Sequence, residues 1–398
     1  MHRQSLHLAA LAAAAVPGLT PVSVVASPDD PADFSAAVVV DAQRQWWRVR
    51  SPRTPEAGIR LETELQVLAA LTPRVRAALP FRTPSVAGAV RLGGLRTFVY
   101  QDMPGRPLPL EDLVPLGEPA VQDVGRVIAA VHTLPSSVVD LADLPVYTAE
   151  EVRNRRLHEL DQAATTGRIP PVLLRRWEEA MEEEALWSFS PVPVHGDLHE
   201  DNLLVERGRV VGVTGWTDLH VGDPAVDLAW LAAAEDPDFA ERVLDAYRGR
   251  RADAGAGDDG DEHLMRRASL LAEFALAQWL VRGVDRHDAD MIAEAEDMLA
   301  ELADAVRGRT HGSAPEHADG EAADGEPAGD AVDADDEDAD GDDAGREREP
   351  DEADEADDQT AALTVVPAPG READRAAARG ARRAQSPGDG ITGGSAPR

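Results

Sequence analysis

The chain has 398 residues, enough for two domains or for one two-lobed domain with an added segment. It contains no cysteine, which excludes disulfides, thiolate catalysis and zinc–thiolate sites. Its formal net charge of -35 argues against nucleic acid as a partner.

The N-terminal part predicts a helix followed by a small β-rich lobe. Residues 6–19 are mainly apolar, a pattern that also fits the apolar part of a secretion signal. Because only Arg3 and the amino group add positive charge before them, we expect instead an N-terminal helix in a cytoplasmic protein. No stretch approaches the ~20 apolar residues of a membrane span. Strands are expected at 22–26, 36–40, 46–50 and 97–101.

A helix is expected at 56–71, between the third and fourth strands. Leu61, Leu65 and Leu68 recur at the spacing of one helix face, which predicts an apolar stripe. From Leu108 onward the pattern is mainly helical. Helices are expected at 121–132, from a capping box at 148–151 to a stop near 167, and from 171 onward. Further helices are expected up to about 306, with a break at 250–262.

The most informative stretch is 195–205, which reads HGDLHEDNLLV. Phosphoryl transfer needs a carboxylate that accepts or orients the proton of the attacking hydroxyl group. It also needs an amide oxygen, further along the loop, that holds Mg²⁺ on the nucleotide phosphates. Asp197 and Asn202 have the residue types and the spacing for these two roles. Two apolar runs, 203–205 and 210–213, follow them and predict a short β-hairpin.

This block and a second segment at 222–229, GDPAVDLA, resemble the sequence pattern of the aminoglycoside and macrolide phosphotransferases. The resemblance implies an α+β, bilobal, protein-kinase-like fold. A small β-rich N-lobe with the N-terminal helix and an αC-like helix is expected at 1–104. A mostly helical C-lobe with the catalytic loop and the acceptor helices is expected at 105–308. The resemblance also implies ATP or GTP with Mg²⁺, a small-molecule acceptor, and roles in ordering the loop for His195 and Asp227.

The same resemblance assigns nucleotide-binding residues by their positions in this sequence. Arg50, in an Arg-x-Pro context on the third strand, takes the place of the basic residue that contacts the phosphates. Glu64 on the following helix is expected to pair with Arg50, with Glu62 as the competing choice. The base is expected to be held at the end of the fourth strand by backbone groups near Gln101, Asp102 and Met103.

The sequence departs from the family pattern at two places that bear on catalysis. Gly215 stands where the family has the metal-binding Asp that corresponds to the first residue of the kinase DFG motif. Asp218, three residues further on, is the candidate metal ligand in its place, together with Asn202. The expected phosphate-covering loop, 27–33, has no glycine and three aspartates, whose carboxylates would repel phosphates.

The C-terminal segment differs in composition from the rest of the chain. Residues 311–398 include 25 acidic residues, 8 arginines and no aromatic residue. Such a segment cannot bury enough apolar surface to offset its conformational entropy, so a disordered acidic tail is expected at 309–398. Its one apolar run, 360–366, is either a docking motif for a protein partner or a linker.

Three functional hypotheses remain open. The first is a phosphotransferase that moves the γ-phosphoryl group of ATP or GTP to a hydroxyl group of a small molecule. The apolar stretch 270–281 and the Arg-x-Pro context favour a macrolide-like acceptor. The second is a pseudokinase that binds nucleotide or ligand without transfer, which Gly215 and the loop 27–33 favour. The third is a scaffold that acts through its acidic tail.

Overall fold

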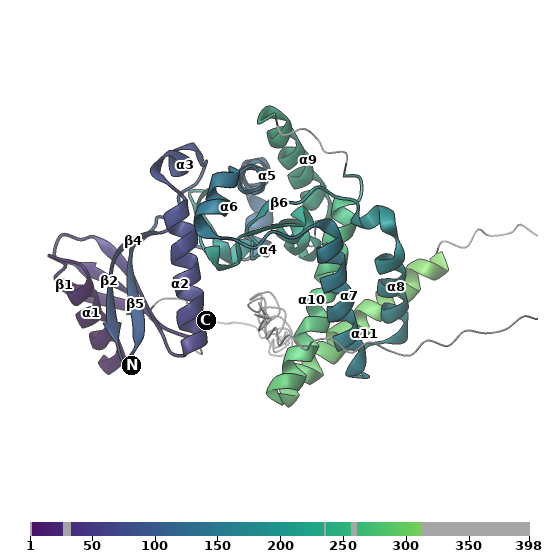
Figure 1. Ribbon diagram of the computed structural model, residues 1–398, viewed down its shortest axis with the longest axis horizontal. Helices are drawn as coiled ribbons and strands as arrows, with labels where there is room; N and C mark the ends of the chain where they lie inside the picture. The colour runs from purple at the N-terminus through teal and green to yellow at the C-terminus, as the bar shows by residue number, and fades with distance from the viewer. Residues whose placement is uncertain (1, 27–32, 235, 256–260, 313–398) are drawn as a thin grey trace, which may run out of the picture. The chain divides into compact units, whose positions relative to one another are not determined.

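The computed structural model describes residues 2–26, 33–234, 236–255 and 261–312 (Figure 1). Its N-terminal part contains a five-stranded antiparallel sheet in the order β1-β2-β3-β5-β4. The strands are β1 (Pro21–Ala26), β2 (Phe34–Asp41), β3 (Trp46–Pro52), β4 (Ser85–Leu92) and β5 (Leu95–Gln101). The four strands expected from the sequence are confirmed. The edge strand β4 was not predicted, because Gly88 interrupts its apolar pattern at a bulge.

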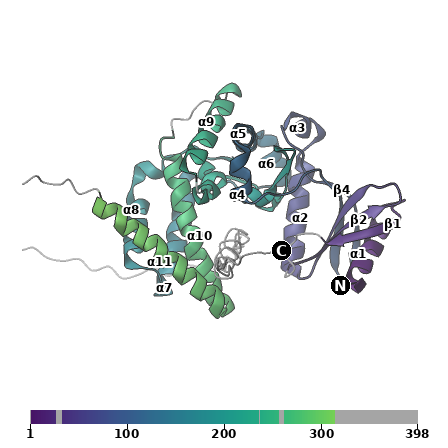
Figure 2. The same cartoon turned by 180° about the vertical axis from the view of Figure 1, so that it is seen from behind.

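Two helices, α1 (His2–Ala15) and α2 (Pro55–Ala70), lie on opposite faces of this sheet (Figures 1 and 2). On β3, Val49 is buried under α1 together with Val99 of β5. Because side chains alternate along a strand, Arg48 and Arg50 point to the other face, where α2 packs. The apolar stripe predicted for α2 is confirmed, since Leu61 and Leu68 are buried there and Leu65 is partly buried.

The remainder of the described chain is mainly helical. Its α-helices are α3 (Pro73–Ala78), α4 (Leu110–Leu113), α5 (Glu118–His132), α6 (Ser136–Ala142), α7 (Ala149–Thr165), α8 (Pro171–Glu182), α9 (Pro237–Asp253), α10 (Leu264–Arg286) and α11 (Ala289–Gly312). The predicted capping box is present at the start of α7, where Thr148 and Glu151 exchange hydrogen bonds. α9 continues to Asp253, so the break expected from residue 250 begins later than predicted. The two-part α+β organisation expected from the sequence is thus confirmed.

Two short strand pairs place the loops between them side by side. β6 (Val192–Val194) pairs with β9 (His220–Gly222), and β7 (Leu203–Glu206) pairs with β8 (Arg209–Val213) as the predicted hairpin. The connection from β6 to β7 is the stretch 195–202, and the connection from β8 to β9 is 214–219. Both connections therefore begin and end at paired strands, which brings 195–202 next to 214–219.

The hairpin is fixed to helix α5 by one buried carboxylate. Asp123 of α5 is 1% exposed and accepts hydrogen bonds from Arg209 Nε and Nη2, each at 2.7 Å. It also accepts the backbone N–H of Val210 at 3.0 Å. On another side α5 approaches α9 closely at Gly125, where a Cβ atom would meet the backbone nitrogen of Tyr247 at 2.7 Å. Any larger residue at position 125 would push these helices apart.

No helix in the described ranges is long and apolar enough to cross a membrane. The expected tail lies outside the described residues from 313 onward, and so does its apolar run at 360–366. Residues 309–312, expected as the start of the tail, belong to α11. Of the expected phosphate-covering loop, only Asp33 is described.

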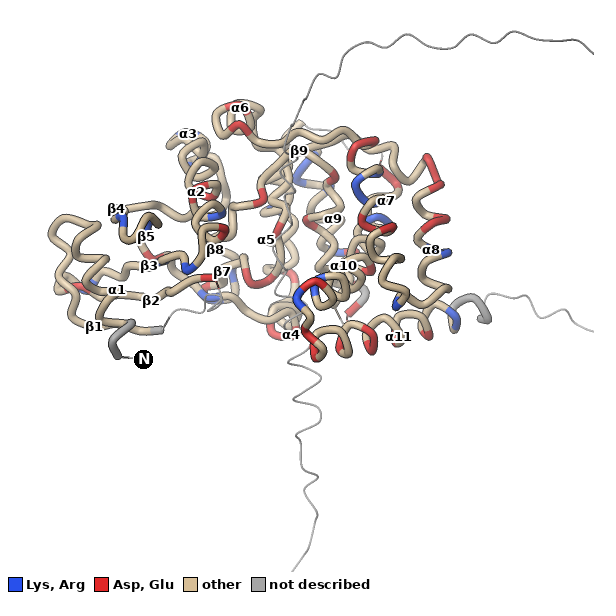
Figure 3. Tube along the Cα trace, turned by 60° about the horizontal axis from the view of Figure 1, so that its bottom comes forward, with Lys and Arg blue, Asp and Glu red and all other residues tan. Residues whose placement is uncertain are grey.

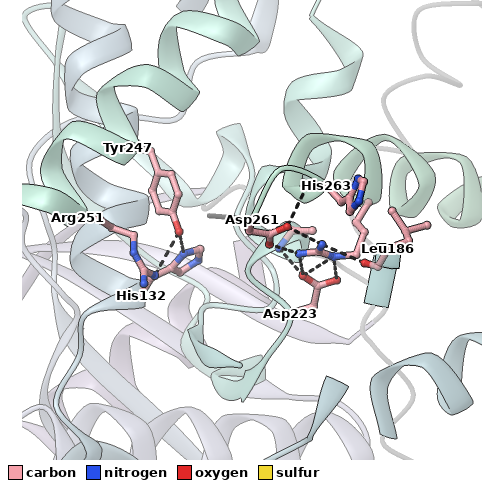
Figure 4. A network of polar contacts seen from close by, with 9 residues as sticks. His132, Leu186, Asp223, Tyr247, Arg251, Asp261 and His263 are labelled. Carbon is pink, nitrogen blue, oxygen red and sulfur yellow. Dashed lines mark hydrogen bonds and ion pairs between the residues drawn. The ribbon is translucent and has the colours of Figure 1, made fainter. Parts of the chain in front are cut away.

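A buried arginine links helix α10 to the segment that follows β9. Arg267 is 1% exposed, and its guanidinium donates to both carboxylate oxygens of Asp223 at 3.0–3.2 Å (Figure 4). It also donates to Asp261 and to the carbonyl oxygen of Leu186. These bonds connect α10 to the Gly-Asp-Pro turn at 222–224, which leads into the 3₁₀ helix η5 (Pro224–Ala233).

We expect Arg267→Met to lower the free energy of unfolding by about 3–5 kcal/mol, because it leaves the buried Asp223 carboxylate without a cation. The matched control is Arg266→Met at the neighbouring position, whose ion pair with Glu183 is solvent-exposed. That control is expected to change stability little. Urea denaturation of both variants measures the difference, and equal losses would contradict a structural role for the buried pair.

Candidate active site

The stretch 195–202 is held in place by a single carboxylate, that of Asp227 in η5. Asp227 is fully buried, and its two oxygens accept the backbone N–H groups of His195 at 2.7 Å and Gly196 at 2.9 Å. Two consecutive amides bound to one rigid carboxylate fix the direction in which the chain enters Asp197. The structure thus places the two residues expected to order the loop, His195 and Asp227, in direct contact.

A chain of polar side chains leads from Asp227 through His132 to Tyr247 and Arg251, and Figure 4 shows the last three of these residues. His132, at the end of α5, donates from Nε2 to Asp227 at 3.1 Å. Its Nδ1 lies 3.0 Å from the hydroxyl group of Tyr247 in α9, which in turn accepts a bond from Arg251 at 3.3 Å. From the sequence, His132 is simply a helix-end histidine. Its role appears only because α5 and α9 pack side by side.

His195 itself is buried under Trp216, with 4.8 Å between the ring centroids. Burial lowers its pKa, so the ring is neutral at neutral pH. The Thr214 carbonyl oxygen, 3.0 Å from Nε2, can only accept, and Nε2 therefore carries the hydrogen. His195 joins the two neighbouring connections and is not placed to act as a base.

Asp197 and Asn202, the two residues predicted for chemistry, lie against each other. Asn202 Nδ2 donates to the Asp197 carbonyl oxygen at 2.6 Å and lies 3.2 Å from Asp197 Oδ2. His199 Nε2 is 3.5 Å from Asp197 Oδ1, so the carboxylate has polar neighbours on both oxygens. Burial lowers the pKa of His199, but the Asp197 and Asp201 carboxylates outweigh this and raise it above its ordinary value.

Gly215 adopts a left-handed backbone, φ 81° and ψ 38°, directly against Asn202. A Cβ atom built there would lie 2.6 Å from the Asn202 amide nitrogen and oxygen. Asn202 Oδ1 meanwhile accepts the Thr214 hydroxyl at 3.2 Å. The Asn202 amide therefore fills the space beside Gly215 that a side chain at position 215 would need.

Asp218, in the 3₁₀ helix η4 (Trp216–Asp218), lies next to the same loop. A Cβ atom on Gly196 would overlap the Asp218 carbonyl oxygen, which shows how closely the two connections approach. Burial and the negative charge of Asp197 raise the pKa of Asp218 to about 7, while Arg60 of α2 opposes the rise. The Asp218 carboxylate is close enough to Asp197 for their charges to interact, and Asp197 in turn contacts Asn202.

On the sheet, Arg50 of β3 pairs with Glu64 of α2, with 2.9 Å between Nη1 and Oε2. Glu64 is 3% exposed and also lies 3.4 Å from the Tyr100 hydroxyl group. The competing residue, Glu62, pairs instead with Arg96 at the surface. The Arg50 guanidinium also lies over the Phe34 ring, 4.4 Å from its centroid. Glu64 and not Glu62 pairs with Arg50 because Glu64 lies on the buried face of α2. Helix periodicity alone did not distinguish the two residues.

The end of β5 forms the connection to the helical part. Gln101 is the last residue of β5 and pairs with Trp47 of β3. The Asp102 amide donates to the Trp46 carbonyl oxygen at 2.9 Å, and its carboxylate lies 3.6 Å from Arg48 Nε. Met103 is partly buried.

Among the described residues, no group of three or more His, Asp or Glu side chains is arranged to hold a metal ion.

Comparison with known proteins assigns the chain to a family. A sequence model described as the phosphotransferase enzyme family matches residues 26–257, more than half of the chain. The chain belongs to the phosphotransferase enzyme family. The match spans most of the sheet, the loop 195–202 and the Asp227 anchor.

Curated relatives of this phosphotransferase include viomycin phosphotransferase from Streptomyces vinaceus, which is 31% identical over 253 residues. That alignment covers 60% of this chain and 82% of the relative. An uncharacterized protein, YcbJ of Bacillus subtilis (strain 168), is 24% identical over 227 residues, which cover 54% of this chain and 72% of YcbJ.

Solved structures establish the fold. The macrolide 2'-phosphotransferase MphH from Brachybacterium faecium, as apoenzyme, has a TM-score of 0.61 and 23% identity, covering 75% of this chain and 98% of its own. The GDP and kanamycin complex of APH(2")-IIia has a TM-score of 0.62 and 20% identity, covering 76% and 99%. The bilobal protein-kinase-like fold expected from the sequence is confirmed.

We expect Gly215→Ala to lower the free energy of unfolding by about 2–3 kcal/mol, because it adds a left-handed alanine and an overlap with Asn202. Gly94→Ala is the matched control, since Gly94 has φ 89° and open space around it. The control is expected to lose only about 1–2 kcal/mol from backbone strain. Urea denaturation compares the two variants. Equal losses of unfolding free energy would show that the Asn202 side chain moves aside without cost.

Proposed function

We propose that this phosphotransferase moves the γ-phosphoryl group of ATP or GTP to a hydroxyl group of a small molecule. The observation that carries the proposal is the contact of Asp197 with Asn202 on a loop anchored by Asp227. The relatives support nucleotide use, because solved structures of this fold include GDP- and ADP-bound aminoglycoside phosphotransferases. Since nucleoside triphosphates are supplied in the cytoplasm, we place the reaction there.

In the proposed reaction, Asp197 accepts or orients the proton of the acceptor hydroxyl group as the oxygen forms its bond to the γ-phosphorus. The bond from that phosphorus to the bridging oxygen breaks, and the nucleoside diphosphate leaves. Arg50, held by Glu64, supplies a guanidinium for the α- and β-phosphates. Backbone groups of Gln101, Asp102 and Met103 hold the base at the end of β5.

The side chains beside the loop also suit a magnesium ion. Asn202 and Asp218 offer amide and carboxylate oxygens, the hard ligands that Mg²⁺ prefers, and Mg²⁺ commonly takes its other ligands from phosphates and water. When bound, Mg²⁺ neutralises charge on the β- and γ-phosphate oxygens. Asp218 thus takes the role that an Asp at position 215 has in the family.

The acceptor belongs to the small, hydroxyl-bearing molecules that relatives modify. The apolar side chains of 270–281 are no argument for a macrolide, since Phe274, Trp279 and Leu280 are buried in the core. The Arg-x-Pro context at Arg50 still favours a macrolide-like acceptor. Helices α7, α8 and α11 carry acidic residues (Figure 3), a residue type that a polycationic aminoglycoside would need around it. Erythromycin, kanamycin and viomycin are therefore the first acceptors to compare.

A pseudokinase is the second candidate, and a specific observation favours it. Gly215 removes one carboxylate, and Asn202 turns its amide nitrogen toward Asp197 while its oxygen is already bonded to Thr214. Loss of a metal carboxylate is expected to cost about a thousandfold in rate. A role as scaffold rests on the tail, which lies outside the described residues.

Calorimetric titration of the full chain with GTP and ATP separates the two candidates. We expect one of them to bind in the presence of Mg²⁺ and to bind at least about tenfold more weakly after EDTA is added, because the phosphates then lose a shared cation. Titration of MgCl₂ into the protein alone is the control. Equal nucleotide affinity with and without Mg²⁺ would support the pseudokinase.

We expect Asp197→Asn to lower the rate of phosphoryl transfer by about 10²–10⁴-fold and to leave nucleotide affinity within about threefold. The amide keeps the size of the carboxylate and one acceptor oxygen but accepts no proton. Transfer is followed as nucleoside diphosphate release with each acceptor, and Asp236→Asn, at the cap of α9, is the control. An unchanged rate in Asp197→Asn would overturn its catalytic role.

A further inference from the structure

A second arginine approaches the same aromatic ring as Arg50. Arg60 of α2 lies one helical turn before Glu64, and its guanidinium carbon is 5.7 Å from the centroid of Phe34. The guanidinium of Arg50 lies over the same ring at 4.4 Å. Two cations from different elements, β3 and α2, are therefore gathered around one side chain at the start of β2.

The partner of Arg60 is Asp33, directly before β2. The two side chains are 30% and 29% exposed, whereas Glu64, the partner of Arg50, is 4% exposed at its side chain. The Arg60–Asp33 pair is thus open to water and is worth little to the fold. Asp33 is also the one described residue of 27–33, the loop that is expected from the sequence to cover the nucleotide phosphates.

The helix that carries Arg60 also packs against η4. η4 ends at Asp218, whose backbone lies directly beside Gly196 of the loop 195–202. Arg60 thus stands on a helix that reaches both Asp33 and the neighbourhood of that loop.

We propose that Arg60 is a second phosphate-binding residue, which exchanges Asp33 for the terminal phosphate of the bound nucleotide. This inference rests on the proposed function. A terminal phosphate carries more negative charge than one carboxylate and accepts the guanidinium fork through two oxygens. The chain has no lysine, so arginine guanidinium groups are the permanently charged donors that it can offer to a phosphate.

The test compares a triphosphate with a diphosphate in the full chain. Calorimetry with Mg²⁺ and the non-hydrolysable β,γ-imido triphosphates of guanosine and adenosine, and with GDP and ADP, measures the affinities. Arg60→Gln is expected to weaken triphosphate binding by about tenfold and diphosphate binding by less than about threefold. Asp33→Asn is expected to strengthen triphosphate binding by about threefold, because it removes the competing carboxylate.

The matched control is Arg96→Gln. Arg96 also pairs with a glutamate of α2, Glu62, and lies over a phenylalanine ring, 4.9 Å from the centroid of Phe98. Arg96→Gln is expected to change neither the triphosphate affinity nor the diphosphate affinity. Thermal unfolding of each variant checks that the fold is kept.

Two results would overturn the inference while leaving the proposed function intact. Equal weakening by Arg60→Gln and Asp33→Asn would show that the pair only ties the loop to α2. Equal loss of triphosphate and diphosphate affinity in Arg60→Gln would remove the terminal phosphate as its ligand. If the unaltered chain binds none of the four nucleotides, the proposed function is overturned, and this inference with it.

Discussion

The geometry of the site depends on one buried carboxylate that accepts two consecutive backbone amides. Asp227 holds His195 and Gly196, and so determines where Asp197 stands. Burial would raise the pKa of Asp227, but hydrogen bonds from His132 and the loop hold it below its ordinary value. A lowered pKa means that the charged form stabilises the fold at neutral pH. This contribution is lost as the pH falls through the pKa of the folded state.

The second constraint is the close approach of the two connections beside Asp227. Gly196 and Gly215 both have positive φ, and a side chain on either would strike the opposite connection. This approach brings Asp218 to the loop 195–202 and lets the Asn202 amide occupy the space beside Gly215. Gly215 is therefore packed against the Asn202 amide, which is itself bonded to Thr214.

Three arginines of β3 and α2 bring positive charge to one face of the sheet. Arg48, Arg50 and Arg60 each have a carboxylate partner, namely Asp102, Glu64 and Asp33 in that order. These pairs differ in burial, and burial decides how each responds to a ligand. The pair with the buried Glu64 fixes Arg50 in one geometry. The exposed pairs are weaker and leave their guanidinium groups available to an anion.

The sequence by itself determined four of the five sheet strands, the α2 stripe, the capping box of α7 and the hairpin after Asn202, because each is encoded by local periodicity or turn chemistry. It also selected Asp197 and Asn202, whose spacing lies within one loop. Only the tertiary structure decided that Glu64 and not Glu62 meets Arg50, that His132 supports Asp227, and that Asp218 stands beside Asp197. These contacts join residues far apart in the chain or depend on which helix face is buried, and no local pattern records them.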